Sequence, residues 1–311
     1  MDREKPARRA GGSNLPKIVV LLGQTASGKT ALSIALAKRF GGEVISADSR
    51  QVYRGLDLGT GKVTKSEMAR VPHHLLDVAD PKRVYSVARF VRDADHAIQD
   101  ILARGKLPII CGGTGFYIDA LLSGAPLPDV APNPELRTAL KNRSTDYLAV
   151  MLDDLDPDRA ATIDRKNPVR LIRAIEIATA LGKVPARPSA PARYATEKIG
   201  IAWPKDALAE RIHMRLSARM RQGMLAEAKR LHAAGLSWRR MEDLGLEYRY
   251  MARHLRGDID RATMLRELER AIVQYAKRQM TWFKRDHETH WLKPEDAIHD
   301  AEELVNKFLT Q

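Results

Sequence analysis

The segment GQTASGKT, residues 23–30, constrains the fold of this 311-residue chain more than any other. It follows the apolar run KIVVLL and precedes ALSIALAKRF, a helical pattern that ends at Gly41-Gly42. The spacing G-x-x-x-x-G-K-[ST] between a strand and a helix is typical of loops that bind phosphate groups. Its glycines let backbone amides point at an anion, and the helix N-terminus adds positive charge. The segment therefore predicts a site for a di- or triphosphate.

We expect every residue of this loop to contribute to the phosphate site. Lys29 supplies a full positive charge, and the Thr30 hydroxyl is placed to bind a Mg²⁺ that bridges two phosphates. A glycine turn without a ligand is the alternative, which the flanking strand and helix disfavour. The expected phosphate-binding set is Gly23, Gln24, Thr25, Ala26, Ser27, Gly28, Lys29 and Thr30.

Strands and helices continue to alternate beyond the loop. The apolar runs EVISA (43–47), KLPIIC (106–111) and KIGIAWP (198–204) indicate strands, and a helix is expected from Val87 to Ala103. This alternation predicts an α/β fold in which a P-loop-type parallel sheet is flanked by helices on both faces. After KIGIAWP we expect only helices.

Prolines mark a change of character in the middle of the chain. The helical patterns LRTALKNR and NPVRLIRAIEIATALGK lie between proline-rich borders, and the second stops at Gly182 as at a helix cap. We interpret this segment as a helical insertion domain. The expected organisation is a flexible tail over 1–14, an α/β core over 15–124, the helical insertion over 125–193, and a return strand with C-terminal helices over 194–311.

The charge balance favours a polyanionic partner. The chain has 52 lysines and arginines against 39 acids, a net charge of +13. Residues 159–193 concentrate this excess, with eight Lys or Arg against two Asp or Glu. Composition alone leaves nucleic acid, a phosphorylated metabolite and a membrane surface as candidates. Because no apolar run is long enough to span a membrane and the first residues are polar, we expect a cytoplasmic protein without a membrane partner.

Asp48 directly follows the second expected strand, at the edge where open parallel sheets bind ligands. A carboxylate there could bind magnesium or accept a proton from a nucleophile. An N-cap for the following turn is the alternative interpretation. No acid follows KLPIIC, where an ATPase usually carries its second metal ligand. We interpret His73 and His74 as a structural or cleft-lining turn and the single Cys111 as inert packing.

Six blocks of sequence carry a resemblance to a known family. They are GQTASGKT, ISADSRQVYRGLDLGTGK (45–62), VPHHLLDV (71–78), GGTGFYIDALLSG (112–124), RLIRAIEI (170–177) and QYAKRQMTWFKRD (274–286). In these blocks the chain resembles bacterial tRNA dimethylallyltransferases, also called tRNA isopentenyltransferases, over residues 18–292. The resemblance implies that the chain transfers a dimethylallyl group from dimethylallyl diphosphate to N6 of the adenosine 3′-adjacent to the tRNA anticodon, with Mg²⁺.

The resemblance also implies roles for particular residues. Asp48 would orient the adenine amine and take its proton, while Lys29, Thr30 and Arg215 act on the diphosphate. Arg211, Arg215 and Arg219 recur at every fourth residue beside an apolar stripe, as at the rim of an anion pocket. For Arg211 and Arg219 the alternative interpretation is the polar edge of an ordinary amphipathic helix. We expect a flipped adenine and a monomeric enzyme. The expected tRNA contacts are Asp48, Ser49, Arg50, Gln51, Thr114, Val169, Arg170, Leu171, Ile172 and Arg173, with Arg137 added for its place in the insertion.

Several positions depart from the family pattern. Gln24 stands where proline is usual, Asn167 where aspartate is usual, and Ile272-Val273 where a Thr-Arg pair is usual. None of these positions is expected to carry the chemistry.

Three other functions stay open on the sequence. An adenylate isopentenyltransferase that modifies free AMP or ADP would share the loop and Asp48, but it has little use for a basic insertion. A small-molecule or nucleotide kinase would use the same loop on ATP. A non-enzymatic RNA-binding module would not need a complete phosphate loop.

Overall fold

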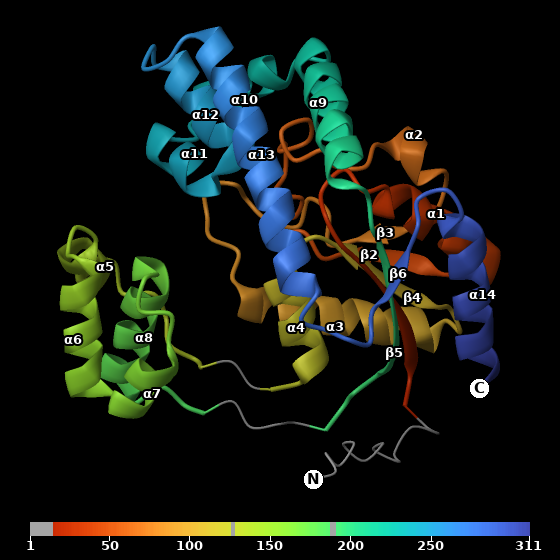
Figure 1. Ribbon diagram of the computed structural model, residues 1–311, viewed down its shortest axis with the longest axis horizontal. Helices are drawn as coiled ribbons and strands as arrows, with labels where there is room; N and C mark the ends of the chain where they lie inside the picture. Colours follow the sequence, from red (N-terminus) through yellow and green to blue (C-terminus); the bar gives the residue numbers. More distant parts are fainter. Residues whose placement is uncertain (1–14, 126–127, 187–190) are drawn as a thin grey trace. The chain divides into compact units, whose positions relative to one another are not determined.

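A parallel sheet forms the centre of the fold. The structure is a computed structural model that describes residues 15–125, 128–186 and 191–311. Its six strands lie in the order β3-β2-β4-β1-β5-β6, and every pair is parallel (Figure 1). The strands are β1 Lys17–Leu22, β2 Glu43–Ser46, β3 His73–His74, β4 Pro108–Gly112, β5 Ala195–Ile201 and β6 His290–Leu292. The expected α/β class is confirmed.

Helices cover both faces of this sheet, as the sequence predicts. α1 and α14 pack on one face with Val19 and Leu21, whereas α3 and α4 pack on the other with Ile18 and Val20. Successive side chains of a strand point to opposite faces, so a strand buried on both sides is a continuous apolar run. The bounds of these helices are α1 Lys29–Phe40, α3 Val87–Ala103, α4 Gly115–Ser123 and α14 Ala297–Thr310.

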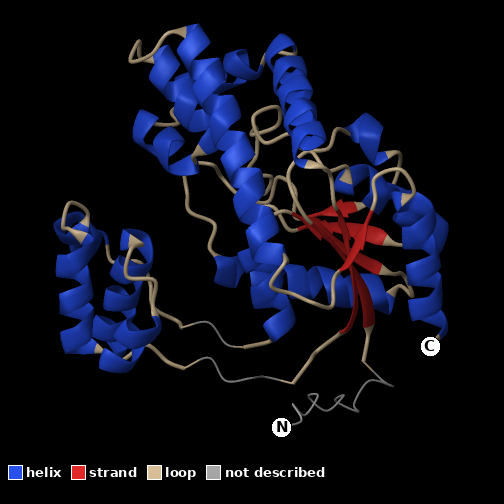
Figure 2. Cartoon of the chain, viewed as in Figure 1, coloured by secondary structure: helices blue, strands red, loops and turns tan. Residues whose placement is uncertain are grey.

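A layer of helices follows β5. Figure 2 shows these helices gathered on one side of the sheet. Their buried residues belong to the same apolar cluster as those of α3 and α4. The longest, α13, contacts α4, α9 and α12. No helix in the described ranges has the length and apolar character that a membrane span requires. The bounds are α9 Lys205–Arg221, α10 Met224–Ala233, α11 Trp238–Leu244, α12 Leu246–Leu255 and α13 Arg261–Phe283. The short helix α2, Lys65–Met68, comes before β3 and is not part of this layer.

Two short strands differ from the sequence-based expectations. The expectation of helices alone after KIGIAWP is wrong, because Ile199, Gly200 and Ile201 of β5 pair in parallel with β6. The expected turn at His73 and His74 is the edge strand β3, which pairs with β2. Both strands have only two or three residues, so their pairing depends on neighbours distant in the sequence and leaves no local pattern.

The two histidines of β3 have structural partners. Nδ1 of His73 lies 2.9 Å from the Val71 carbonyl oxygen, and burial lowers the pKa of His73. Nε2 of His74 lies 2.7 Å from the buried carboxylate of Glu43. Hydrogen bonds from Arg104 and from His74 and Lys106 outweigh burial and lower the pKa of Glu43 to about 2. The Glu43 carboxylate therefore joins β2 to β3 and to the segment before β4.

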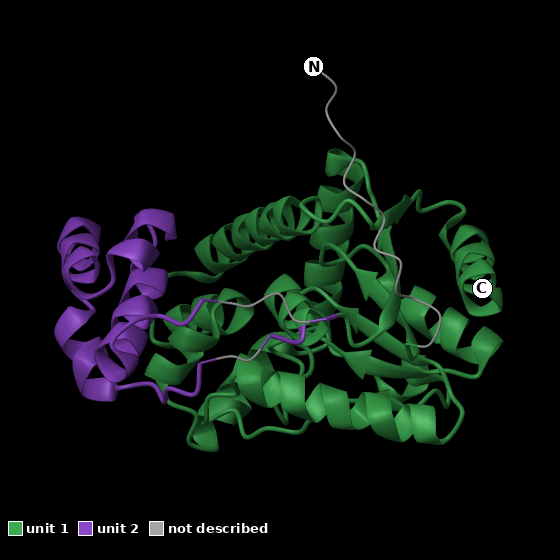
Figure 3. Cartoon of the chain, turned by 90° about the horizontal axis from the view of Figure 1, so that it is seen from below, with its two compact units in different colours: residues 1–123, 192–311 green, residues 124–191 purple. Residues whose placement is uncertain are grey.

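Residues 124–191 form a compact unit of their own, separate from the unit of residues 1–123 and 192–311 (Figure 3). Its helices enclose a small apolar core. Asn167, one of the departures from the family pattern, caps α8 by accepting a hydrogen bond from the Arg170 amide at 3.2 Å. The expected insertion, 125–193, differs from this unit by one or two residues at each end; the expected tail lies outside the described residues. The helices are α5 Pro134–Leu140, α6 Thr145–Leu155, α7 Pro157–Thr162 and α8 Pro168–Leu181.

Candidate active site

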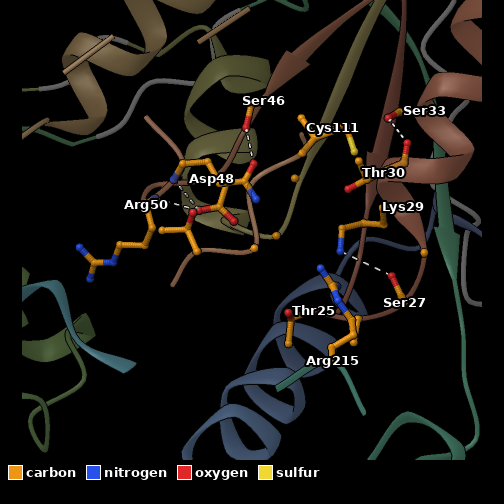
Figure 4. A pocket seen from close by; sticks show the side chains of 18 of the residues that line it. Thr25, Ser27, Lys29, Thr30, Ser33, Ser46, Asp48, Arg50, Cys111 and Arg215 are labelled. Carbon is orange, nitrogen blue, oxygen red and sulfur yellow. Dashed lines mark hydrogen bonds between the residues drawn. The ribbon is translucent and has the colours of Figure 1, made fainter. Parts of the chain in front are cut away.

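A cleft of about 810 Å³ lies at the carboxyl ends of β2 and β4 and is walled by the phosphate loop that follows β1 (Figure 4). It is lined by loop residues 25–30, by the turn 48–51 after β2, and by side chains of α9 and α13. Arg215 of α9 faces this space. Gln24 is buried under the loop and does not line the cleft. The structure thus brings the expected catalytic residues and six of the eight expected phosphate-binding residues together around one cavity, whereas Gly23 and Gln24 lie outside its lining.

The backbone of the loop has the form of an anion-binding nest. φ is positive at Gly23 (136°), Ala26 (62°) and Gly28 (98°). Such left-handed residues turn neighbouring amides toward the same concave side. α1 begins at Lys29 and no side chain caps it, so the amides of its first turn stay available to an anion. The loop can therefore surround a phosphate group with backbone donors.

Lys29 is held over this nest. Its Nζ donates to the Gln24 carbonyl oxygen at 2.5 Å and to Ser27 Oγ at 3.5 Å. Burial lowers the pKa of Lys29 to about 8, although the charge of Asp48 opposes this shift and that of Arg215 adds to it. A buried ammonium with a lowered pKa binds an anion strongly, because the anion restores the favourable environment of the charged form.

The three arginines of α9 have different surroundings. Arg211 Nε donates to the Ala26 carbonyl oxygen at 2.9 Å, and Arg219 Nη1 donates to the Leu58 carbonyl oxygen at 3.2 Å. Arg215 makes no hydrogen bond or ion pair with any described residue and is exposed in the cleft. Desolvation and the charges of Arg219 and Arg211 lower its pKa. Arg211 also lines the cleft, but of the three only Arg215 has no hydrogen-bonding partner among the described residues, so its whole guanidinium is available to a ligand.

Asp48 serves the turn after β2 and also faces the cleft. Its Oδ1 accepts hydrogen bonds from the amides of Arg50 at 2.8 Å and Gln51 at 3.3 Å. Its Oδ2 accepts none from the described part of the chain. Asp48 therefore caps the turn, which was the alternative interpretation of the sequence, and lines the cleft as well. The two amides fix the carboxylate and leave one oxygen for a ligand.

Comparison with known proteins decides the family. The model of the IPP transferase family matches residues 51–286, and an isopentenyl transferase model matches residues 16–84. A tRNA dimethylallyltransferase 2 of Trichlorobacter lovleyi is 45% identical over 296 residues, which cover 94% of this chain and 97% of that relative. The chain belongs to the IPP transferase family. The resemblance carried by the six sequence blocks is thereby confirmed.

Solved structures agree with membership of the IPP transferase family. The full-length tRNA isopentenylpyrophosphate transferase of Bacillus halodurans is 35% identical, with a TM-score of 0.72, covering 94% of this chain and 97% of its own. A eukaryotic dimethylallyltransferase acting on tRNA is 25% identical, with a TM-score of 0.81, covering 95% of this chain and 80% of its own.

The residues that the IPP transferase resemblance assigns to tRNA fall in both compact units. In the larger unit, residues 48–51 line the cleft. Thr114 Oγ1 accepts a hydrogen bond from the Ser49 amide at 3.0 Å, so Thr114 braces this turn from the end of β4. In the unit 124–191, Val169 and Arg170 at the start of α8 are exposed.

Other residues assigned to tRNA are engaged inside the unit 124–191. Leu171 is fully buried in its apolar core, so its side chain is not available for the expected tRNA contact. Arg137 forms two hydrogen bonds, of 2.6 and 2.7 Å, to the buried carboxylate of Glu176. Arg173 bonds to the same carboxylate at 3.1 Å and to the Val130 carbonyl oxygen at 2.8 Å. These two guanidiniums compensate a buried acid and stabilise this unit.

Sequence reasoning missed the side chains that support the phosphate loop from outside. Trp203 Nε1 donates to the Ser27 carbonyl oxygen at 2.9 Å. Gln279 Oε1, on α13, accepts from the Thr25 amide at 2.8 Å. The sequence contains only an indirect indication: Gln279 lies in QYAKRQMTWFKRD, one of the six blocks that carry the family resemblance. Nothing in that block indicates which residue Gln279 contacts.

Proposed function

We propose that this chain transfers the dimethylallyl group of dimethylallyl diphosphate to N6 of the adenosine 3′-adjacent to the anticodon of a tRNA, releasing diphosphate. The observation that carries the proposal is the cleft of this IPP transferase family member, in which the phosphate loop and the carboxylate of Asp48 face one space. Relatives that are 41 to 46% identical are named tRNA dimethylallyltransferases, which supports the same donor and acceptor. We further propose that the chain acts as a monomer in the cytoplasm.

The leaving group is stabilised by the nest. As the bond between the donor's C1 and its bridging oxygen breaks, the electron pair stays with the diphosphate. The loop amides, the Lys29 ammonium and the Arg215 guanidinium are positioned to neutralise the developing charge. Lys29 is held before the donor binds, since the Gln24 carbonyl oxygen and the Ser27 hydroxyl already accept hydrogen bonds from its ammonium.

Asp48 acts on the acceptor. The lone pair of the adenine amine is delocalised into the ring, so the amine needs orientation and removal of a proton to attack C1. Asp48 Oδ2 accepts this proton as the bond between N6 and C1 forms. The hydrogen bonds from Arg50 and Gln51 to Oδ1 keep the carboxylate in place during the step.

The cleft has the features of a site in which Mg²⁺ is bound mainly through the ligand. Thr30 lines the cleft, and its hydroxyl bonds to no described residue. No group of three acidic, histidine or cysteine side chains that could hold a metal occurs in the described ranges. Mg²⁺ commonly takes one or two protein ligands and completes its shell with phosphate oxygens and water. Held by the Thr30 hydroxyl, it would neutralise further charge on the diphosphate.

A transfer assay with three arms tests this function. The chain is incubated with labelled dimethylallyl diphosphate and unmodified tRNA, with the same donor and AMP, and with ATP in place of the donor. We expect label in tRNA alone. Label in AMP would support an adenylate isopentenyltransferase, and phosphate transfer from ATP would support a kinase. Either of these outcomes without labelled tRNA contradicts the proposal.

A further inference from the structure

Two buried carboxamides join the first residues of the phosphate loop to α13. Gln279 and Gln24 are 6% and 7% exposed. Gln279 Oε1 accepts from the Thr25 amide at 2.8 Å, and its Nε2 donates to the Gly113 carbonyl oxygen at 2.9 Å. Gln24 Nε2 donates to the Ala276 carbonyl oxygen at 3.1 Å. The start of the loop is therefore held by a helix more than 250 residues away in the sequence.

The orientation of the Gln279 carboxamide follows from its neighbours. The Gly113 carbonyl can only accept a hydrogen bond and the Thr25 amide can only donate one, so the NH₂ group faces Gly113 and the oxygen faces Thr25. The fit is close, because a Cβ at Gly113 would lie 2.3 Å from Gln279 Nε2. Glycine is thus required at position 113 to admit this side chain.

The Gln279 oxygen removes one donor from the anion site. The Thr25 amide already has an acceptor, so a phosphate can use only the donors that follow in the loop. The left-handed Ala26 turns the next amides inward, and Lys29 covers the same stretch. At the Thr25 end, a phosphate oxygen would meet the lone pairs of Gln279 Oε1 instead of an N–H group.

We propose that Gln279 restricts the nest to two phosphates and makes the site discriminate against triphosphates. A third phosphate that extends toward Thr25 would lose its water without gaining a donor, and would be repelled by the carboxamide oxygen. This inference rests on the proposed function in taking a diphosphate as the natural ligand. Selectivity for a diphosphate would then depend on a residue of α13 as well as on the phosphate loop itself.

The test compares two inorganic anions by isothermal titration calorimetry of the full chain, at one fixed Mg²⁺ concentration. For the wild type we expect pyrophosphate to bind more tightly than tripolyphosphate, although tripolyphosphate carries more charge. For Gln279→Leu we expect the ratio of the two dissociation constants to shift about tenfold toward tripolyphosphate, as for one hydrogen-bonding group gained. Gln24→Leu is the matched control, since it removes the other contact to α13 and leaves the Thr25 amide covered. It should weaken both anions equally.

Several outcomes would overturn the inference. One is an unchanged ratio in Gln279→Leu, with both affinities falling together, which would mean that Gln279 only supports the loop. Equal or tighter binding of tripolyphosphate by the wild type would also overturn it, and this measurement needs no variant to fold. If transfer to tRNA proceeds in either case, the proposed function stands and only the selectivity role fails. A wild type that binds no pyrophosphate would contradict both.

Discussion

Asp48 Oδ1 accepts a hydrogen bond from the backbone amide of Arg50 at 2.8 Å. The same oxygen also accepts from the following amide, so one half of the carboxylate is committed to the shape of the turn. The other half faces the cleft. Any substitution of Asp48 can therefore change both the turn and the proton acceptor, and the two effects must be separated.

Asp48→Asn separates them, because its side-chain oxygen can still cap the turn while the negative charge is lost. We expect the rate of dimethylallyl transfer to fall about 100-fold or more, the usual contribution of a positioned base. The dissociation constant for tRNA should stay within about threefold of the wild type. Asp48→Ala, which also removes the cap, should lose transfer and weaken tRNA binding. Transfer by Asp48→Asn at a near-normal rate would remove the carboxylate from the mechanism.

Lys29 should make diphosphate binding depend on pH. Because its pKa in the free protein is about 8, the ammonium loses its proton as pH rises past that value, and the free energy of anion binding weakens. We expect the affinity for pyrophosphate to fall about tenfold between pH 7 and 9. Calorimetry with Lys29→Met at the same pH values is the control. Since pyrophosphate itself gains charge over this range, the variant should show no fall, and parallel profiles would contradict the prediction.

The phosphate loop shows how far local sequence predicts this structure. β1, the loop and α1 follow one another along the chain, so apolar runs and glycine spacing predict all three. The bounds of β1 and the end of α1 agree with the expectation, but α1 begins at Lys29, two residues before the expected helical run. The supports of the loop are different. Gln279 and Trp203 reach Thr25 and Ser27 from 254 and 176 residues away. No local pattern encodes such contacts, because they exist only after the helices pack on the sheet.

Glu43 should stabilise the fold above acidic pH. Its pKa is lowered to about 2 in the native state, so its contribution is complete above the pKa of the unfolded chain, near 4.5, and is lost as pH falls toward 2. Glu43→Gln should lower the free energy of unfolding at pH 7 by on the order of 3 kcal/mol. Urea denaturation at pH 7 and pH 3 measures this. A difference between wild type and variant that does not shrink at pH 3 would contradict the assignment.

Two arginines of the unit 124–191 should behave differently. Arg137→Ala should destabilise this unit by about 2 kcal/mol, less than for a fully buried pair because Arg137 is about half exposed. Faster hydrogen exchange of α5 and α8 would report it. Arg170→Ala removes an exposed cation and should leave exchange unchanged. If Arg170 contacts a tRNA phosphate, the slope of log Kd against log salt falls by about 1. Equal rates of hydrogen exchange in the two variants would contradict the prediction that only Arg137 stabilises this unit.

The same unit shows why a basic pattern does not predict which cations are free. Arg170 and Arg173 lie three apart on α8, and the spacing alone predicts that both face one surface. In the structure Arg173 bonds to the buried Glu176, whereas Arg170 lies 3.6 Å from Asp164 in an exposed pair. The burial of Glu176 decides this, and burial is a tertiary property.

The central claim is that the loop holds diphosphate as a leaving group for an adenosine that Asp48 activates. The most direct test counts the diphosphate released and the N6-dimethylallyl adenosine formed in one reaction, using nucleoside analysis of digested tRNA for the second quantity. We predict one diphosphate for each dimethylallyl group found on adenosine, and no release without tRNA. Diphosphate released at the same rate without tRNA, or tRNA left unmodified, would contradict the account.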